Sequence, residues 1–196
     1  MLLFEALDQI LARLEERRVK SALLGGLAIS AWTEPRFTRD VDLAVAVRTD
    51  SEAERLVHDL SRHGYALLAT VEQTAAGRMA ATARLSPPGE GHEGMVVDLL
   101  FASSGIEPEI VDAAVELDIG ASTPVRVARA GHLVALKLLA HDPATRPQDA
   151  IDLSALRGML DSNETERAHE ACELIMQRGY ARGRDLPALL RTYLSE

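Results

Sequence analysis

Several residue types are scarce in this sequence of 196 residues, and each scarcity excludes a class of protein. Cysteine occurs once, at Cys172, so the chain can form no intramolecular disulfide and no zinc site built from cysteines. The six histidines do not recur at a spacing typical of metal ligands, so we expect no zinc site from them either. No apolar run approaches the roughly 20 residues that a membrane span needs. The first 18 residues, with Glu5 and Asp8 among them, predict an amphipathic helix and not a signal peptide. We therefore expect a cytoplasmic protein without a membrane partner.

Positive charge is also scarce. The chain has 21 lysines and arginines against 30 aspartates and glutamates, which gives a formal net charge of −9. Because neutralisation of phosphates drives non-specific binding to nucleic acid, this charge argues against a protein that binds long DNA. The basic residues are 19 arginines and only two lysines, Lys20 and Lys137. A lysine is therefore the exception in this chain, and Lys137 lies within the apolar stretch GHLVALKLLA, where a buried lysine needs a counter-charge.

The hydrophobic pattern divides the chain into an α/β half, residues 1–122, and a mostly helical half, residues 123–196. In the first half it predicts helices at 2–18, 27–33, 51–64 and 106–116 and strands at 21–24, 41–47, 65–71, 78–85 and 95–101. A short strand at 125–128 is followed by predicted helices at 131–140, 148–160, 164–178 and 186–194. Ser51 with Glu54 is typical of a capping box, and Thr145 to Gln148 and Asn163 to Glu166 are typical of helix starts.

An acidic pair opens the predicted strand at 41–47. In the segment GGLAISAWTEPRFTRDVDLAV (25–45), Asp40 and Asp42 are two residues apart and therefore share one face of the strand. Val41, Leu43 and Val45 then point to the other face, into a core. Two carboxylates this close repel each other unless a cation lies between them. The alternative is a chance acidic pair at a solvated strand start.

Two further features fall near this pair. Asp98 is the one charge in the apolar strand MVVDLLF, so it needs a metal, an arginine or backbone donors. Gly25-Gly26 separates a strand from a helix, where glycines form either a plain turn or a backbone cradle for a phosphate. Thirteen residues separate Gly26 from Asp40, enough for a helix and a return loop that bring both features to one cleft. Three convergent carboxylates are typical of Mg²⁺ sites for phosphoryl chemistry.

This arrangement resembles the nucleotidyltransferase superfamily related to DNA polymerase β. The signature of that superfamily is a glycine pair, then Asp-hydrophobic-Asp/Glu-hydrophobic, then a third carboxylate on a later strand. It is matched here by GG (25–26), DVDL (40–43) and VVDLL (96–100). Residues 132–156, HLVALKLLAHDPATRPQDAIDLSAL, resemble the downstream block of the AbiEii-type toxin nucleotidyltransferases, with Lys137 on the helix and Asp149 or Asp152 as the late carboxylate. His141 stands where those toxins usually carry a second basic residue.

The resemblance implies a polymerase-β-like α/β core, a mixed sheet flanked by helices, with a helical C-terminal part. It implies that Asp40, Asp42 and Asp98 are catalytic and hold two Mg²⁺ ions. Gly25, Gly26, Arg39 and Lys137 would bind an NTP such as ATP, and Arg36 and Thr38 flank the acidic pair. The chain would move an NMP to a hydroxyl of an RNA 3′ end or of a protein side chain. It would act as the toxin or the antitoxin enzyme of a pair, with a cognate partner.

Alternatives remain at three points. Lys137 can neutralise a triphosphate or form a structural ion pair with Asp149 or Asp152, and these two aspartates can simply be acids that favour a helix N-terminus. The whole chain can be a non-catalytic nucleotide-binding or antitoxin-type interaction module with the same fold. The DxD pattern alone also occurs in glycosyltransferases, which the early Gly-Gly and the short chain disfavour.

Overall fold

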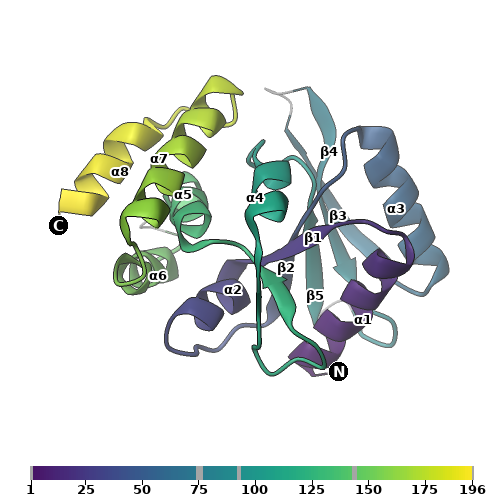
Figure 1. Ribbon diagram of the computed structural model, residues 1–196. Helices are drawn as coiled ribbons and strands as arrows, with labels where there is room; N and C mark the ends of the chain where they lie inside the picture. Colours follow the sequence, from purple (N-terminus) through teal and green to yellow (C-terminus); the bar gives the residue numbers. More distant parts are fainter. Residues whose placement is uncertain (1, 74–76, 92–93, 143–144, 196) are drawn as a thin grey trace.

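A mixed β-sheet forms the centre of the computed structural model, which describes residues 2–73, 77–91, 94–142 and 145–195 (Figure 1). The sheet has seven strands in the order β3-β4-β5-β2-β1-β7-β6. The pairs β2–β5 and β1–β7 are parallel, and the other neighbours are antiparallel. The strands are β1 (Ser21–Leu24), β2 (Asp40–Val45), β3 (Ala66–Gln73), β4 (Arg78–Ser86), β5 (Val96–Leu100), β6 (Val115–Leu117) and β7 (Val125–Val127). The predicted α/β class with a mixed sheet is confirmed.

Helices flank the sheet. They are α1 (Leu3–Glu16), α2 (Gly25–Trp32), α3 (Asp50–Arg62), α4 (Glu107–Ala113), α5 (Ala130–Ala140), α6 (Gln148–Arg157), α7 (Ser162–Gln177) and α8 (Leu186–Ser195). In Figure 1, α1 and α3 lie to the right of the sheet, whereas α5 to α8 gather on its left. Helix α2 contacts β1 and β2 and also α5 and α6, so it joins the sheet to the helical second half. None of the helices in the described ranges is long and apolar enough to span a bilayer.

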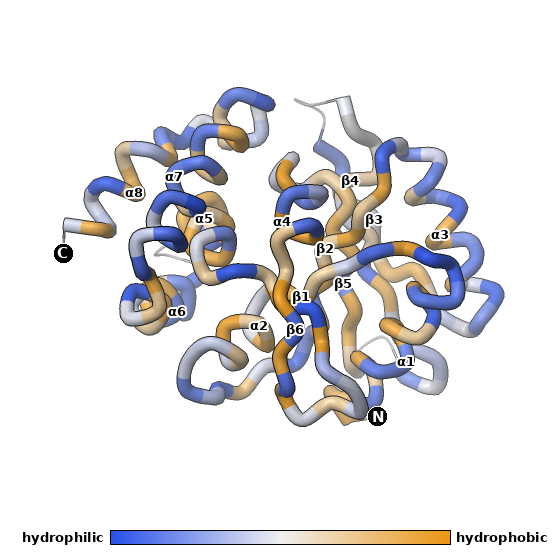
Figure 2. Tube along the Cα trace, in the orientation of Figure 1, coloured by the Kyte–Doolittle hydropathy of each residue, from blue (hydrophilic) through white to orange (hydrophobic). Residues whose placement is uncertain are grey.

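The core lies on the face of β2 and β5 that is opposite to their aspartates. Val41, Leu43 and Val45 of β2 are fully buried, as predicted from the alternation along this strand. On β5, Val97 and Leu99 are buried in the same way. Figure 2 shows hydrophobic residues along the central strands and along α5. This packing fixes the register of β2 and β5, because a shift by one residue would turn their carboxylates into the core.

Three local expectations were wrong. The predicted helix at 106–116 ends at Ala113, because Ala114 is extended (φ −59°, ψ 145°), and 115–117 pair with β7 as strand β6. Helix α3 is capped by Thr49, whose side chain accepts a hydrogen bond from the Glu52 amide, and not by Ser51 with Glu54. Helix α7 begins at Ser162 because Asp161 caps it. The β6–β7 hairpin lies at the edge of the sheet beside β1.

Candidate active site

The three predicted carboxylates lie on adjacent strands. Strands β2 and β5 pair in parallel with Asp42 directly opposite Asp98, and Asp40 lies two residues before Asp42 on the same face. They line a cleft of about 460 Å³ that we call the carboxylate cleft. Its remaining lining residues are Gly25, Gly26, Arg36, Thr38, Arg84, Lys137 and Thr145 to Asp149. The sheet therefore brings Asp40, Asp42 and Asp98 together, as the sequence motif predicted.

The carboxylates of Asp40 and Asp42 are held where negative charge is unfavourable. Burial raises the pKa of Asp42 to about 6, and the neighbouring carboxylates of Asp98 and Asp40 add to this rise. Burial and the Asp98 carboxylate also raise the pKa of Asp40. Oxygen-only donors that repel one another in this way fit a hard cation such as Mg²⁺, which would relieve the repulsion.

An arginine already neutralises Asp98. The guanidinium of Arg84 donates two hydrogen bonds to this carboxylate, from Nε to Oδ1 at 2.9 Å and from Nη2 to Oδ2 at 2.6 Å. Arg84 lies on β4 directly opposite Asp98 on β5. With Asp98 turned to Arg84, no group of three or more His, Cys, Asp or Glu side chains in the described ranges is arranged to hold a metal ion. Arg84 was not among the predicted site residues, although it is the one charge in the apolar stretch from Met79 to Ser86.

Both glycines of the Gly-Gly pair are required by close packing. Gly25 has φ +61°, and a Cβ at this position would lie 1.8 Å from Oδ2 of Asp42. At Gly26, a Cβ would lie 2.6 Å from Nη2 of Arg36 and 2.9 Å from Oγ1 of Thr38. Gly25 therefore brings the N-terminus of α2, where a helix presents backbone N–H groups without intrahelical partners, directly against Asp42.

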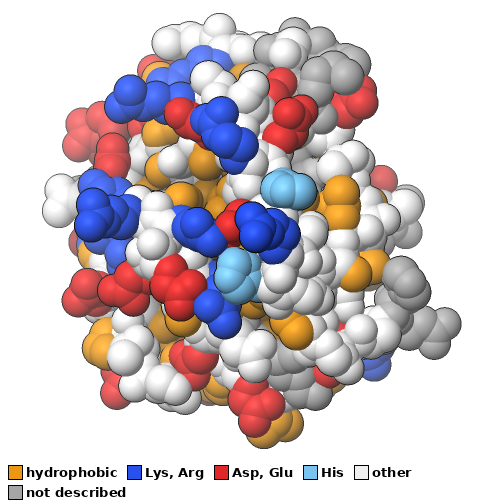
Figure 3. Space-filling view, turned by 90° about the vertical axis from the view of Figure 1, so that its right-hand side faces the viewer, with side chains coloured by type: hydrophobic (Ala, Val, Ile, Leu, Met, Phe, Trp, Pro, Cys, Tyr) orange, Lys and Arg blue, Asp and Glu red, His pale blue; other side chains and the backbone are white. Residues whose placement is uncertain are grey.

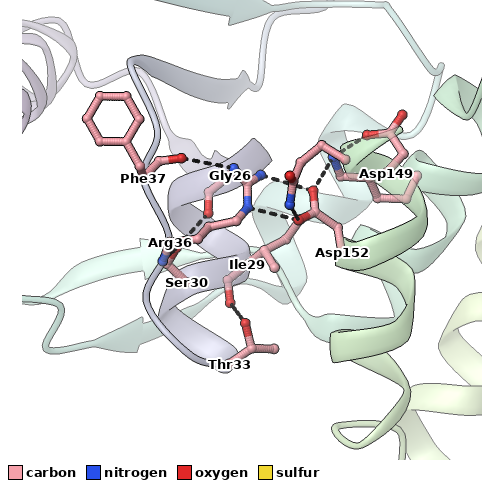
Figure 4. Close-up of polar contacts among 10 residues, drawn as sticks. Gly26, Ile29, Ser30, Thr33, Arg36, Phe37, Asp149 and Asp152 are labelled. Atoms are coloured by element: carbon pink, nitrogen blue, oxygen red, sulfur yellow. Dashed lines mark hydrogen bonds and ion pairs between the residues drawn. The ribbon is translucent and has the colours of Figure 1, made fainter. Parts of the chain in front are cut away.

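Lys137 forms ion pairs with both aspartates of α6. Its Nζ lies 2.6 Å from Oδ1 of Asp149 and 2.7 Å from Oδ2 of Asp152. Asp152 also pairs with Arg36, whose Nη2 donates to Oδ2 at 2.9 Å, as Figure 4 shows. Burial alone would raise the pKa of Asp152, but the hydrogen bond from Lys137 and the nearby charges hold it below its usual value. The structure thus forms the ion pair that was one of the two alternatives for Lys137.

This network ties the cleft to the helical half. Arg36 comes from the segment after α2 and the two aspartates come from α6 (Figure 4), and Lys137 comes from α5. Asp149 also pairs with Arg146, which lines the cleft. Arg39, by contrast, does not line the cleft, because it is exposed and its guanidinium lies 5.6 Å from the centre of the Phe37 ring. Arg36 and Thr38 are therefore the residues of this segment that reach the site.

A larger hollow of about 870 Å³ lies on the other side of the sheet, between α1 and α3. Its rim carries both signs of charge, and Arg17 pairs there with Asp59 at 2.5 Å. Figure 3 shows this side of the molecule, with basic and acidic side chains interspersed. None of the predicted site residues lines this hollow, so the carboxylate cleft is the candidate active site.

Solved structures with the same arrangement of helices and strands show which fold the chain has. The chain is similar to an antigenic nucleotidyltransferase-like protein from Paracoccidioides brasiliensis (TM-score 0.56, 15% identity, covering 96% of this chain and 92% of that one). It is also similar to the antibiotic-resistance factor ANT(2″)-Ia in solution (TM-score 0.52, 17% identity, 98% and 92% covered). A crystal structure of ANT(2″)-Ia with adenylyl-2″-tobramycin matches with a TM-score of 0.53 at 16% identity over 96% and 97% of the chains. At these identities the likeness shows a nucleotidyltransferase fold.

Sequence comparison then gives the family. The model of the family described as nucleotidyl transferase AbiEii toxin, type IV toxin–antitoxin (TA) system, matches residues 9–194, and the chain belongs to this family. No curated protein sequence matches the chain. The match covers both the sheet and the helical half. The resemblance, which was predicted from motifs between residues 25 and 156, therefore extends to α7 and α8.

Proposed function

We propose that the chain is a Mg²⁺-dependent nucleotidyltransferase that moves an NMP from an NTP to a hydroxyl acceptor. The observation that carries this proposal is the placement of Asp42 opposite Asp98 on parallel strands, with Asp40 on the same face and the N-terminus of α2 against them. Membership of a nucleotidyltransferase family supports it.

Asp40, Asp42 and Asp98 would hold the metal. Bound Mg²⁺ supplies Lewis-acid stabilisation of the charge that develops on the phosphates. The backbone N–H groups at Gly25 and Gly26 face the triphosphate, as at other helix N-termini that bind phosphate. Arg36 and Lys137 add positive charge beside the cleft, but both are already paired with Asp152, so they orient the site more than they neutralise the nucleotide.

In the proposed reaction the acceptor oxygen attacks the α-phosphorus of the NTP. A new P–O bond forms to the acceptor, the bond to the bridging α–β oxygen breaks, and pyrophosphate leaves. The hydroxyl proton passes to a cleft carboxylate, and Asp98 is our candidate. This assignment requires Asp98 to lose at least one of its two hydrogen bonds from Arg84 when substrates bind.

The test is incubation of the protein with Mg²⁺, a cell lysate and each NTP labelled on the α-phosphate in turn. We expect one macromolecular or small-molecule fraction to take up label with one or a few NTPs. Asp42→Asn should abolish labelling, while Asp112→Asn, which removes an exposed carboxylate on α4, should label normally. Full labelling by Asp42→Asn would contradict the proposal.

The ion pair between Arg84 and Asp98 gives one observation in favour of the second candidate, a non-catalytic nucleotide-binding or antitoxin-type interaction module. In that case a guanidinium would replace the catalytic cation permanently. Tight NTP binding without release of pyrophosphate, in the presence of Mg²⁺ and lysate, would favour this module over the enzyme.

For the acceptor, we propose local engagement of an RNA 3′ end, with a protein hydroxyl as the alternative. The net charge of −9 disfavours a grip on a whole tRNA body, because such a grip needs many contacts from basic residues to phosphates. Transfer to bulk tRNA should therefore depend only weakly on salt between about 50 and 200 mM. Six to ten phosphate contacts would instead reduce affinity by about 10³–10⁵ over this range. The family description also implies a partner gene product, which we propose as the cognate toxin or antitoxin.

A further inference from the structure

Three charged side chains form a row across adjacent strands of the sheet. Arg84 on β4 lies opposite Asp98 on β5, and Asp98 lies opposite Asp42 on β2. Directly opposed residues on neighbouring strands project from the same face, so the guanidinium and both carboxylates face the carboxylate cleft. The sheet therefore places a cation beside the acidic group by register, without any contribution from a loop.

The guanidinium uses both oxygens of Asp98. Nε and Nη2 of Arg84 form a two-pronged contact with Oδ1 and Oδ2, which is the strongest geometry for an arginine and a carboxylate. A metal ion shared between Asp42 and Asp98 needs at least one of these two oxygens. Arg84 and a metal ion therefore compete for the same lone pairs.

The two partners differ in how easily they can separate. The side chain of Asp98 is 11% exposed, whereas that of Arg84 is 49% exposed. Arg84 can therefore turn its guanidinium toward solvent and keep its hydration, while Asp98 stays in the cleft and needs another cation. When Arg84 leaves, another cation must replace it at Asp98. Asp40 and Asp42 lie beside Asp98 in the cleft and would bind that cation together with it.

We propose that Arg84 is an internal counter-cation of the active site, which holds Asp98 in the metal-free protein and is displaced from it by the divalent ion. This inference rests on the proposed metal-binding function of the cleft. It makes Arg84 a positioning residue that lowers the affinity of the site for metal, since the ion must remove a bound positive charge before it reaches Asp98.

Metal binding to the full chain without nucleotide tests the inference. Binding of Mn²⁺ would be measured by electron paramagnetic resonance for the wild type, Arg84→Gln and Arg84→Lys. Arg62→Gln serves as the control, because it removes one exposed positive charge at the end of α3, away from the cleft. We expect Arg84→Gln to bind Mn²⁺ at least about tenfold more tightly than the wild type, since both competition and charge repulsion are removed. Arg84→Lys should bind within about threefold of the wild type, and Arg62→Gln should be unchanged.

Equal or weaker Mn²⁺ binding by Arg84→Gln would overturn the inference, because Arg84 would then not compete with the metal for Asp98. If the wild type and every Arg84 variant bind no Mn²⁺, the proposed metal site fails and this inference fails with it. Binding by the wild type that Arg84→Gln does not strengthen leaves the metal site intact and refutes the role of Arg84 alone.

A second measurement needs no substitution that removes the ion pair. The Nε–H resonance of Arg84 would be followed in ¹⁵N-labelled wild-type protein, with Arg84→Lys used only to assign it. Titration with diamagnetic Mg²⁺ should move this resonance and speed its exchange with solvent, because the hydrogen bond to Oδ1 of Asp98 is lost. A resonance that stays in place and remains protected at saturating Mg²⁺ would refute displacement.

Discussion

Asp42→Asn should stabilise the metal-free protein while it abolishes transfer. Asp42 lies between Asp40 and Asp98 and directly against Gly25, and its pKa rises from the ordinary value of 3.8 to about 6. Each pKa unit corresponds to about 1.4 kcal/mol. Burial of the charge, with repulsion from Asp98 and Asp40, thus lowers the free energy of unfolding at pH 7 by at most about 3 kcal/mol. Asparagine has almost the same shape and carries no charge, so it removes this cost.

The sign of the pH dependence follows from the raised pKa. Below about pH 4, Asp42 is protonated in both the folded and the unfolded protein, so its charge contributes nothing. Between about pH 4 and pH 6 the unfolded chain loses its proton first, and the wild type loses stability as the pH rises. The advantage of Asp42→Asn should therefore be near zero at pH 4 and reach its full value above about pH 6.

Thermal unfolding at several pH values measures this effect. For a chain of this size, 1 kcal/mol corresponds to about 2–4 °C in Tm, so we expect a rise of up to about 10 °C at pH 7. Addition of Mg²⁺ should stabilise the wild type more than Asp42→Asn and so narrow the gap. Asp112→Asn, which removes an exposed charge, should shift Tm little at any pH. A variant that is no more stable than the wild type at pH 7, or equally stabilised at pH 4 and pH 7, would refute the reasoning.

Three other substitutions test separate parts of the structure. Lys137→Met leaves two buried carboxylates without their shared cation, so it should lower the free energy of unfolding by about 3–5 kcal/mol in a denaturant titration. A loss below about 1 kcal/mol would show that these ion pairs contribute little to stability. Gly25→Ala places a methyl group against Asp42 at a positive φ, so it should lower the free energy of unfolding by more than about 1 kcal/mol. The same substitution should lower it by less in the Asp42→Ala variant, and equal losses in both backgrounds would exclude the clash. His132 is buried, and burial lowers its pKa to about 4. Between pH 6.5 and pH 4 the unfolded chain therefore takes up this proton before the folded protein does, and the free energy of unfolding decreases as the pH falls. His132→Gln should therefore lose less stability than the wild type between pH 6.5 and pH 4 in urea titrations, and parallel curves would contradict the burial of a neutral histidine.

The parts of the fold that depend on local pattern could be predicted from the sequence. The alternation of β2 placed Val41 and Leu43 in the core and Asp40 and Asp42 on the opposite face, because one-sided burial leaves only one register. The long amphipathic or apolar helices were also found, to within a few residues at their ends. The short strand β6 was not found, because its three residues carry too little periodicity to separate them from the end of the preceding helix.

The partners of charged residues could not be predicted from spacing. Asp98 is the one charge of β5 and Arg84 the one charge between Met79 and Ser86, which indicates that each needs a partner, but only the strand order places β4 beside β5. The same limit applied to Lys137, for which either Asp149 or Asp152 was a possible partner and both are used. The capping residue of α3 was misassigned because Thr49 and Ser51 are both good caps, and the choice between them depends on how the chain leaves β2.

Comparison of two labels on the same nucleotide tests the central claim most directly. The protein would be incubated with Mg²⁺, lysate and the preferred NTP, labelled in one reaction on the α-phosphate and in another on the γ-phosphate. Nucleotidyl transfer by the carboxylate cleft predicts that the acceptor takes up only the α-label and that the γ-label appears in pyrophosphate. With Asp42→Asn, the acceptor should remain unlabelled and no labelled pyrophosphate should form. Uptake of the γ-label by the acceptor, or unchanged uptake of the α-label by Asp42→Asn, would contradict the account.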